Sequence, residues 1–243
     1  MKKAALLIIA SLTFLPSLVA QEISKDLKPF RKVIASPHIN LVLNKGDQES
    51  IRLVYSRVSE DKLNIRQQGK TLHIYLDDAK VTEKTRKDGY SRRGIYPVVN
   101  VTAYVTYKSL EELEIRGNQE LSCLDPIRSK RFTIRAYGEN EISLASVTTE
   151  YLVTRLYGEN SLEINGGKAQ FQKYSLYGQN DIDTHSVKSY SATANIYGES
   201  KLHLSTDDEL KVNSFGEGQV LYSGDAKVNE RLMFGQTRIS RIE

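Results

Sequence analysis

Cysteine and tryptophan are almost missing from this sequence of 243 residues, which has one cysteine, Cys123, and no tryptophan. One cysteine cannot form an internal disulfide, so apolar burial and strand pairing must hold the fold together. Proline is scarce as well, with five residues, and no segment is rich enough in Pro, Gly or Ser to separate two domains. These absences favour one domain built around one core.

Charge of one sign is also lacking. Lys and Arg number 34 against 30 Asp and Glu, a net charge of +4. Lys2 and Lys3 lie in a predicted leader, and without these two residues the count is 32 against 30, or +2. A chain so close to neutral lacks the basic excess of a nucleic-acid-binding protein, so we expect no nucleic-acid partner.

Motifs that carry catalysis or hold a cofactor are not visible. The sequence has no G-x-S-x-G, H-E-x-x-H, P-loop, Rossmann or EF-hand motif. His38, His73 and His185 have no partners at the spacing typical of metal ligands. We therefore expect no cofactor, no metal and no catalytic residues.

The first 20 residues have the features of a secretory signal peptide. Lys2 and Lys3 precede an apolar run from Ala4 to Leu15, and small residues end in Ala20, where cleavage would leave Gln21 as the new terminus. The apolar run is too short to span a bilayer, and no later run is apolar enough to do so. We expect an exported protein of residues 21–243, in the periplasm, at the cell surface or outside the cell.

One short sequence motif recurs from residue 115 onward: an arginine or aromatic residue, a glycine, polar residues and then Leu, Ile or Val. The spacings between successive glycines are 21, 20, 20, 20, 18 and 19 residues, for Gly117, Gly138, Gly158, Gly178, Gly198, Gly216 and Gly235. Self-similarity at a period of this length is the signature of a solenoid.

Within each repeat, apolar residues alternate with polar ones on both sides of the glycine. Phe132, Ile134 and Ala136 precede Gly138 in this way. A period of two indicates strands, and stacked units would pair equivalent strands in parallel, about 4.8 Å apart. The sequence therefore predicts an all-β, single-domain parallel β-helix with repeats of about 20 residues, two short strands flanking a bend at each glycine, and the right-handed form that parallel crossovers prefer.

Residues 30–110 are β-rich but less regular, and we expect them to form an N-terminal cap on the repeats of residues 111–243. Gly69-Lys70 predicts a hairpin turn. The basic segment 78–94 has no periodicity and predicts a long exposed loop, either solvated or touching anionic glycans or lipid headgroups. Alternating runs predict strands at 33–35, 39–43, 51–55, 63–65, 72–76 and 98–105.

The order of several sequence blocks is distinctive. It runs Ile39-Asn40-Leu41-Val42-Leu43-Asn44-Lys45-Gly46, Leu63-Asn64-Ile65 and Thr71-Leu72-His73-Ile74, then the serial glycine units and Leu221-Tyr222-Ser223-Gly224. In this order the blocks resemble a known bacterial family of unknown function, the auto-transporter adhesin head or GIN domain. The resemblance runs from about Phe30 to Glu243 and implies a β-helix, an envelope or extracellular location and an adhesin-like role.

Four tyrosines occupy the position just before the repeat glycine: Tyr137, Tyr157, Tyr177 and Tyr197. They are continued by Phe215 and Phe234, and since the neighbouring position faces inward, these rings should face outward and stack into a ladder. A ladder that serves only packing is one interpretation, and a platform for the apolar faces of sugars is the other. Asn140, Asn160 and Asn180, two residues after the glycine, predict an internal, structural asparagine ladder.

Glu163, Asp183 and His203 all lie five residues after a repeat glycine, so they should sit on adjacent units of one outward face. A metal site or acid–base chemistry would need groups this close together. Exposed charged residues are common, however, and we interpret these three as a polar face. Cys123 falls on an inward position and should be a buried small apolar side chain.

Three functions fit these features. The first is a non-catalytic, adhesin-like module of the cell envelope that binds a glycan or another cell-surface component. The second is a polysaccharide lyase or hydrolase, since β-helices can host such chemistry, although the fold alone is a weak argument for it. The third is a structural protein or assembly subunit joined through exposed solenoid ends.

Overall fold

The computed structural model describes residues 20–88 and 91–242, so the predicted signal peptide lies outside the described residues except for Ala20. The described chain is built from strands, with one short 3-10 turn at Glu60–Lys62. Among the described residues, no helix has the length and apolar character needed to cross a membrane. The predicted all-β class is confirmed.

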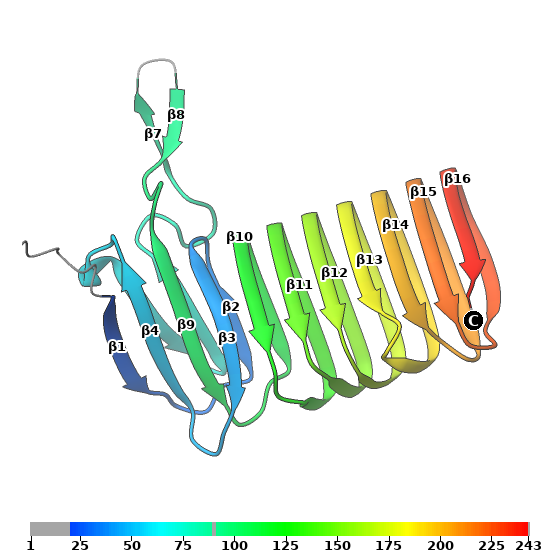
Figure 1. Cartoon of the computed structure of the whole chain (residues 1–243), viewed down its shortest axis with the longest axis horizontal. Coiled ribbons are helices and arrows are strands. Elements are labelled where there is room, and N and C mark those ends of the chain that lie inside the picture. The colour runs from blue at the N-terminus through cyan, green and yellow to red at the C-terminus, as the bar shows by residue number, and fades with distance from the viewer. Residues whose placement is uncertain (1–19, 89–90, 243) are drawn as a thin grey trace, which may run out of the picture.

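Seven long strands form the repeating part of the solenoid (Figure 1). They pair in parallel, each with the next, so that Gly117, Gly138 and Gly158 lie side by side. The same register continues to Gly235. The strands are β10 (Glu112–Cys123), β11 (Ile127–Leu144), β12 (Val147–Ile164), β13 (Gly167–Thr184), β14 (Lys188–Ser205), β15 (Glu209–Ser223) and β16 (Lys227–Arg241).

The chain turns at each repeat glycine, which we call the corner. The sequence predicted two short strands there, but strand pairing continues through the glycine, so each unit is one strand folded into two arms (Figure 1). Gly158 has a φ of +110°, a backbone conformation that side chains with a Cβ rarely adopt. The corner therefore needs glycine for its backbone conformation.

The core is a continuous column between the two arms. Leu156, Leu176 and Ile196, two residues before their glycines, are fully buried. Leu162 and Ile164 bury the opposite arm in the same way. Each such side chain contributes about 1.5–3 kcal/mol of apolar burial, so repetition of the pattern adds stability unit by unit. The predicted inward positions are confirmed.

The N-terminal part continues the solenoid rather than covering it as a separate layer. β2 (Lys32–Ala35) and β3 (Ile39–Lys45) pair in parallel with the two arms of β10. β6 (Thr71–Leu76) then pairs with β2, and β9 (Asn100–Tyr107) pairs with β3, both in parallel. The predicted strands and the solenoid therefore share one core, formed by segments about eighty positions apart in the chain, as in the pair Leu41 and Leu121.

Antiparallel strands close this end of the column. β4 (Ser50–Ser56) pairs with β9, and β5 (Leu63–Gln68) pairs with β6 through the predicted turn at Gly69. β1 (Gln21–Asp26) pairs with β4 and extends the cap upstream of residue 30, where it was predicted to begin. Its sequence, QEISKD, is mostly polar and exposed, so no apolar alternation marked it as a strand.

The prediction of a long loop over residues 78–94 is wrong in part. Thr85–Asp88 (β7) and Ser91–Gly94 (β8) form an antiparallel hairpin that stands out from the body (Figure 1). Its four-residue strands consist mainly of charged and polar residues, so they have no apolar face to produce the alternation that identifies strands.

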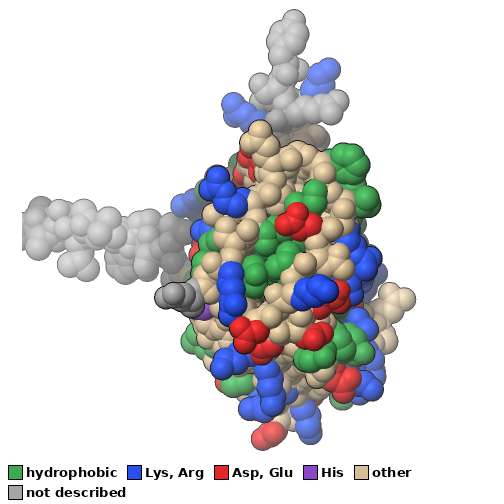
Figure 2. All heavy atoms as spheres, turned by 90° about the vertical axis from the view of Figure 1, so that its right-hand side faces the viewer, with side chains coloured by type: hydrophobic (Ala, Val, Ile, Leu, Met, Phe, Trp, Pro, Cys, Tyr) green, Lys and Arg blue, Asp and Glu red, His purple; other side chains and the backbone are tan. Residues whose placement is uncertain are grey.

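The opposite end of the column is open. β16 pairs with β15, and its other edge has no partner strand in the described part of the chain. Leu232 and Phe234 are 54% and 60% exposed there, and Met233 and Ile239 are only partly buried. Viewed from this end, apolar side chains lie in the middle of a face rimmed by charges (Figure 2).

Candidate functional site

The four predicted tyrosines form a stacked ladder along the corner. The ring centroids of Tyr137 and Tyr157 are 5.1 Å apart, and those of Tyr157 and Tyr177 are 4.7 Å apart. Tyr177 and Tyr197 are separated by 4.8 Å, and all these pairs are within 5° of parallel. Each inner ring is thus covered on both faces by its neighbours, so the ladder presents ring edges and hydroxyl groups to solvent.

Among the described residues, Tyr137 and Phe234 are the two end rings of the stack, and Tyr137 is the end ring on the N-terminal side. Phe215 and Phe234 continue the stack beyond Tyr197. On the other side of Tyr137, Arg116 occupies the equivalent position of the preceding strand. Its guanidinium forms an ion pair with Glu114 at 2.5 Å and donates a hydrogen bond to the carbonyl oxygen of Lys80 at 3.0 Å. Tyr137 lines a cavity at this point.

This cavity lies where the N-terminal part meets the first corners of the solenoid. Its volume is about 490 Å³. One wall is Pro37, His38 and residues 81–83, and the other is formed by residues 116–119 and 137–139. The aromatic ring of Tyr137 therefore faces a space that also holds the carboxylates of Glu83 and Glu139 and the side-chain amides of Asn118 and Gln119.

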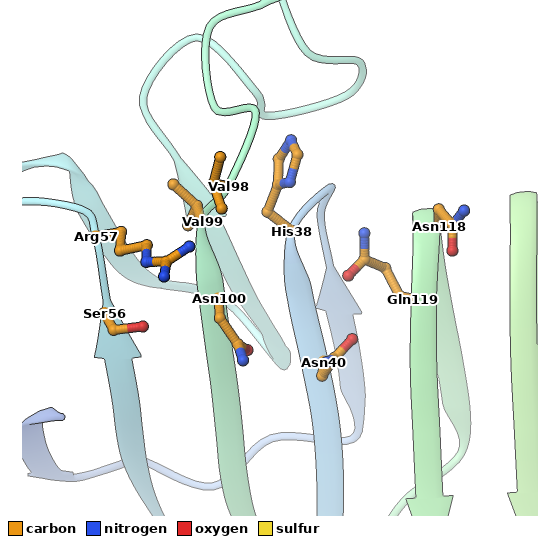
Figure 3. Close-up of a pocket in the computed structure, with 9 residues that line it drawn as sticks. All are labelled: His38, Asn40, Ser56, Arg57, Val98, Val99, Asn100, Asn118 and Gln119. Carbon is orange, nitrogen blue, oxygen red and sulfur yellow. The ribbon is translucent and has the colours of Figure 1, made fainter. Parts of the chain in front are cut away.

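A second cavity of about 510 Å³ adjoins the first, and both share His38, Asn118 and Gln119. Amides from three neighbouring strands line it, from Asn100 on β9, Asn40 on β3 and Gln119 on β10, and Arg57 points toward them (Figure 3). We call the two cavities together the junction groove. Its remaining lining residues are Ser56, Val98 and Val99.

His38 directly follows Pro37, which lies opposite the corner glycine Gly117 in the first unit. Its φ is +72°, which is uncommon for a residue with a side chain. The imidazole Nε2 lies 3.1 Å from a carboxylate oxygen of Glu83, and the ring contacts Tyr96 edge to face. This strained conformation, with contacts that hold it, places the imidazole between the two cavities.

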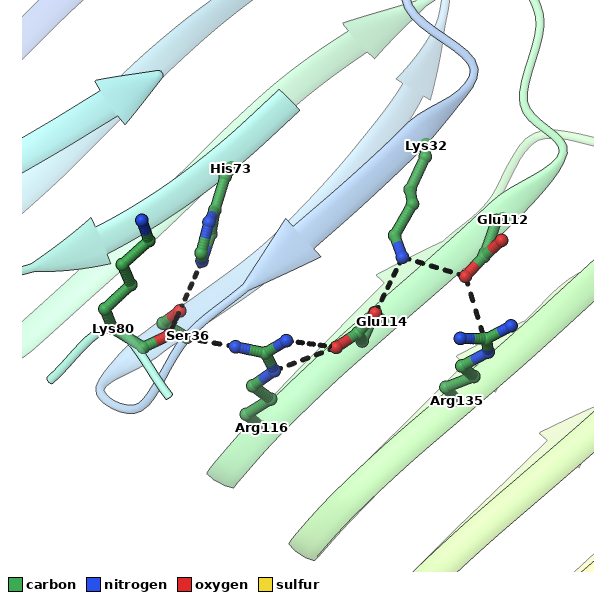
Figure 4. Close-up of polar contacts among 8 residues, drawn as sticks. All are labelled: Lys32, Ser36, His73, Lys80, Glu112, Glu114, Arg116 and Arg135. Atoms are coloured by element: carbon green, nitrogen blue, oxygen red, sulfur yellow. Dashed lines mark hydrogen bonds and ion pairs between the residues drawn. The ribbon is translucent and has the colours of Figure 1, made fainter. Parts of the chain in front are cut away.

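A network of polar contacts on the other side of the corner holds the wall of the groove in place (Figure 4). Arg116 and the Ser36 hydroxyl, which donates at 2.7 Å, both bind the carbonyl oxygen of Lys80. Glu114 joins Arg116 to the Lys32 ammonium, 2.8 Å away. Because residues 81–83 directly follow Lys80, whose carbonyl oxygen is held by the network, these residues are fixed over the corner.

His73 belongs to this network as a neutral imidazole. Since the Ser36 hydroxyl donates to Lys80, it accepts a hydrogen bond from His73 Nε2 at 2.8 Å. Burial, and then the positive charges of Arg116 and Lys80, lower the pKa of His73 from 6.5 to about 4. In the unfolded chain the same side chain takes up a proton near pH 6.5.

We predict that the free energy of unfolding falls as the pH is lowered from 6.5 to 4, by about 2–3 kcal/mol from His73. In this window the unfolded state binds the proton and the folded state does not, so acid favours unfolding. Replacing His73 with glutamine keeps a donor for Ser36 and should flatten this part of the stability curve, as measured by urea unfolding at a series of pH values. An equal slope in parent and His73→Gln would contradict the assignment.

The predicted asparagine ladder is confirmed. The Asn140 amide donates to Asn160 at 2.9 Å, and Asn160 donates to Asn180 at 3.0 Å. Gln119 and Ser200 extend the same column at its two ends. All of these side chains are buried, and the ladder pairs their polar groups inside the corner except for Asn140 Oδ1, which has no partner among the described residues.

Glu163, Asp183 and His203 lie in register on adjacent strands, as predicted. The structure adds His185, which lies in the turn after β13, and the expectation that this residue has no partners is wrong. Asp183, His185 and His203, which we call the histidine cluster, bring their ligand atoms within 4.8 Å of one another, and Glu163 is not part of that group.

Cys123 is buried, as predicted. The hydroxyl of Tyr107 lies 3.5 Å from its sulfur, and burial raises the pKa of the thiol. A thiol held protonated inside the core is a poor nucleophile, which agrees with a packing role.

A family model described as "Putative auto-transporter adhesin, head GIN domain" matches residues 29–226. The chain belongs to this family. The matched segment ends before β16, although β16 continues the same solenoid. Membership identifies the chain as an adhesin-like module and is typical of exported or cell-surface proteins. No curated protein matches the sequence.

Several solved structures of other bacterial proteins have a fold similar to that of this GIN-domain protein. A putative adhesin from Bacteroides fragilis has a TM-score of 0.75 at 14% identity, with 93% of this chain and 99% of that chain covered. One from Parabacteroides merdae has a TM-score of 0.64 at 16% identity, over 92% and 96% of the two chains. A putative lipid binding protein from Parabacteroides distasonis has a TM-score of 0.57 at 15% identity, over 91% and 97%. Identities this low establish the fold alone.

Proposed function

We propose that this GIN-domain protein is exported and acts as a non-catalytic, adhesin-like module that binds glycans of a cell surface through the junction groove. The observation that carries the proposal is that Tyr137, the end ring of the ladder, lines a cavity together with amide and carboxylate side chains. The other tyrosines of the ladder, Tyr157, Tyr177 and Tyr197, act by stacking behind that ring and holding its orientation.

The chemistry of the groove suits a sugar. A pyranose ring has an apolar face, which stacks on an aromatic ring, and a rim of hydroxyls that both donate and accept hydrogen bonds. Amides offer both roles, and Asn40, Asn100, Asn118 and Gln119 line the groove. Asn118 donates to Glu139 at 3.1 Å, which orients its amide beside Tyr137.

Two observations support a role without catalysis. In the groove, Glu83 Oε1 accepts a hydrogen bond of 2.6 Å from the backbone N–H of Tyr96, so this carboxylate already has a fixed partner. Outside it, Glu163 is exposed and Asp183 is held ionised, because its contacts with His185 and His203 outweigh the effect of burial and lower its pKa. A glycosidase needs a carboxyl group whose pKa is raised so that it can donate a proton.

The test compares two tyrosines of the same column. Purified protein is applied to a glycan and mucin array, and the bound glycan is then titrated against Tyr137→Ala and Tyr177→Ala. We expect Tyr137→Ala to bind roughly tenfold more weakly, since an aromatic contact contributes about 0.5–1.5 kcal/mol beyond the apolar area that it buries. Tyr177→Ala should bind within about twofold of the parent.

The same incubations measure turnover. Reducing ends and unsaturated products should stay at the level of buffer alone. Turnover that disappears when Glu163, Asp183 and His203 are all replaced by alanine, in a variant that folds, would favour the lyase or hydrolase. Equal binding by Tyr137→Ala and the parent would contradict the groove as the glycan site.

A further inference from the structure

The histidine cluster lies on the arm that follows the corner, at the turn leading from β13 to β14. Parallel pairing puts Asp183 beside His203, and the turn after Thr184 folds His185 back toward the same place. The two imidazole rings are stacked, with centroids 4.5 Å apart and planes within 9° of parallel.

The three potential ligand atoms lie within 4.8 Å of one another. Nδ1 of His185 lies 2.6 Å from Oδ1 of Asp183, and Nδ1 of His203 lies 3.4 Å from the same oxygen. A tetrahedral Zn²⁺ with bonds of about 2.0–2.2 Å holds its ligand atoms about 3.3 Å apart. The separation of His203 Nδ1 and Asp183 Oδ1 already matches this value, whereas His185 Nδ1 must move away from the oxygen and the stacked rings must tilt so that both nitrogens point at the ion.

The surroundings favour a cation. Glu163 is the next residue along the column and adds a negative charge, while Asp181 and Lys201 lie in register and offset each other. The side chains of the cluster are 44%, 51% and 21% exposed for Asp183, His185 and His203, so an ion can reach them from solvent.

The outer contact of the His185 ring agrees with coordination through Nδ1. His185 Nε2 lies 3.2 Å from the Ser186 hydroxyl, the type of second contact that orients a metal-binding histidine. His203 Nε2 is buried and has no hydrogen-bond partner among the residues that the structure describes, so the polar contact of this ring is at Nδ1.

We propose that Asp183, His185 and His203 form a binding site for a divalent transition-metal ion, with Zn²⁺ as the leading candidate. Imidazole and carboxylate ligands suit Zn²⁺, Ni²⁺ and Cu²⁺, whereas Ca²⁺ and Mg²⁺ require more oxygen ligands than this site offers. Three protein ligands leave one position of a tetrahedral ion for water or for a donor atom of a bound molecule. The ion would also cross-link β13 and β14.

The experiment uses the full chain purified without a polyhistidine tag and stripped of metal by a chelator. Titration with zinc chloride in a calorimeter should show one ion bound per chain with saturation. His203→Gln and His185→Ala should each lower the affinity at least tenfold, while Glu163→Gln, which alters a neighbouring carboxylate outside the cluster, should leave it within about threefold of the parent. Cu²⁺ bound to the parent should show two coupled nitrogens by electron paramagnetic resonance, and one in His185→Ala.

The absence of saturable Zn²⁺ binding by the parent would overturn the proposal. So would equal affinity of the parent and the two histidine variants, with folding of all three verified by circular dichroism. Because the cluster lies outside the junction groove, a failure here leaves the glycan proposal standing, and loss of glycan binding in Tyr137→Ala does not bear on the metal.

Discussion

Replacing Leu156 with aspartate is expected to abolish cooperative folding. Leu156 is fully buried at the centre of the column, with Ala136 and Leu176 in register on the neighbouring strands and both fully buried as well. The substitution removes about 2–3 kcal/mol of apolar burial and places an uncompensated charge in the core, at a further cost of several kcal/mol. A domain of this kind has a total stability of about 5–15 kcal/mol, so a loss of this size removes most or all of the free energy that favours the folded state. Circular dichroism with heating should show no transition.

The matched control is Glu159→Ala, three residues away on the same strand. Glu159 is exposed just beyond the corner, so its removal should change the midpoint of thermal unfolding by no more than about 2 °C. A Leu156→Asp protein that melts like the parent, together with a Glu159→Ala protein that unfolds, would reverse the assignment of inner and outer faces.

The repeating part of the fold could be predicted from the sequence because every unit buries side chains at the same positions relative to its glycine. Leu162 has Ile142, Ile182 and Leu202 at the equivalent positions of neighbouring units, so period and alternation together define which side chains face inward. The ladders follow from the same register. Asn140 and Tyr137 each have the same residue type one unit further along, and strand pairing in parallel then brings like side chains together.

The junction groove could not be predicted in the same way. Its residues come from separate segments, such as His38, Asn100 and Asn118, which strand pairing between distant parts of the chain brings together. A local pattern shows that a segment is a strand but does not name its partner. The role of β2 and β3 as the first unit of the solenoid was missed for this reason, and the cavities beside Tyr137 were missed with it.

His185 was missed for a different reason. Strand register predicts the neighbours of residues inside strands, and it correctly predicts that Asp183 lies beside His203. His185 lies in the turn that follows, where alternation no longer decides the direction of a side chain. A signal was nevertheless present, since Asp183 and His185 are two residues apart at the end of a strand, where a carboxylate can bind the following turn.

Replacing Gly158 with alanine is the second change expected to have a large effect, because it disturbs two adjacent units at once. Gly158 has a φ of +110°, and a Cβ at this residue would lie 3.0 Å from the carbonyl carbon of Gly138 and closer still to its oxygen. The obstacle is backbone, which cannot rotate away as a side chain can, and which is held by strand pairing on both sides. The unfavourable φ adds about 1–3 kcal/mol, so we expect a total loss of at least about 3 kcal/mol in urea unfolding.

The control for Gly158→Ala is the same substitution at Gly166, in the connection between β12 and β13. A Cβ there would lie 3.6 Å from the carbonyl oxygen of Ala145, an ordinary contact, and the backbone is outside the left-handed region. Gly166→Ala should therefore leave stability within about 1 kcal/mol of the parent, or raise it slightly by restricting the unfolded chain. If Gly158→Ala lost as little stability as Gly166→Ala is expected to lose, the corner would not need glycine. The repeat would then be preserved for the packing of the tyrosine ladder rather than for the backbone conformation of the turn.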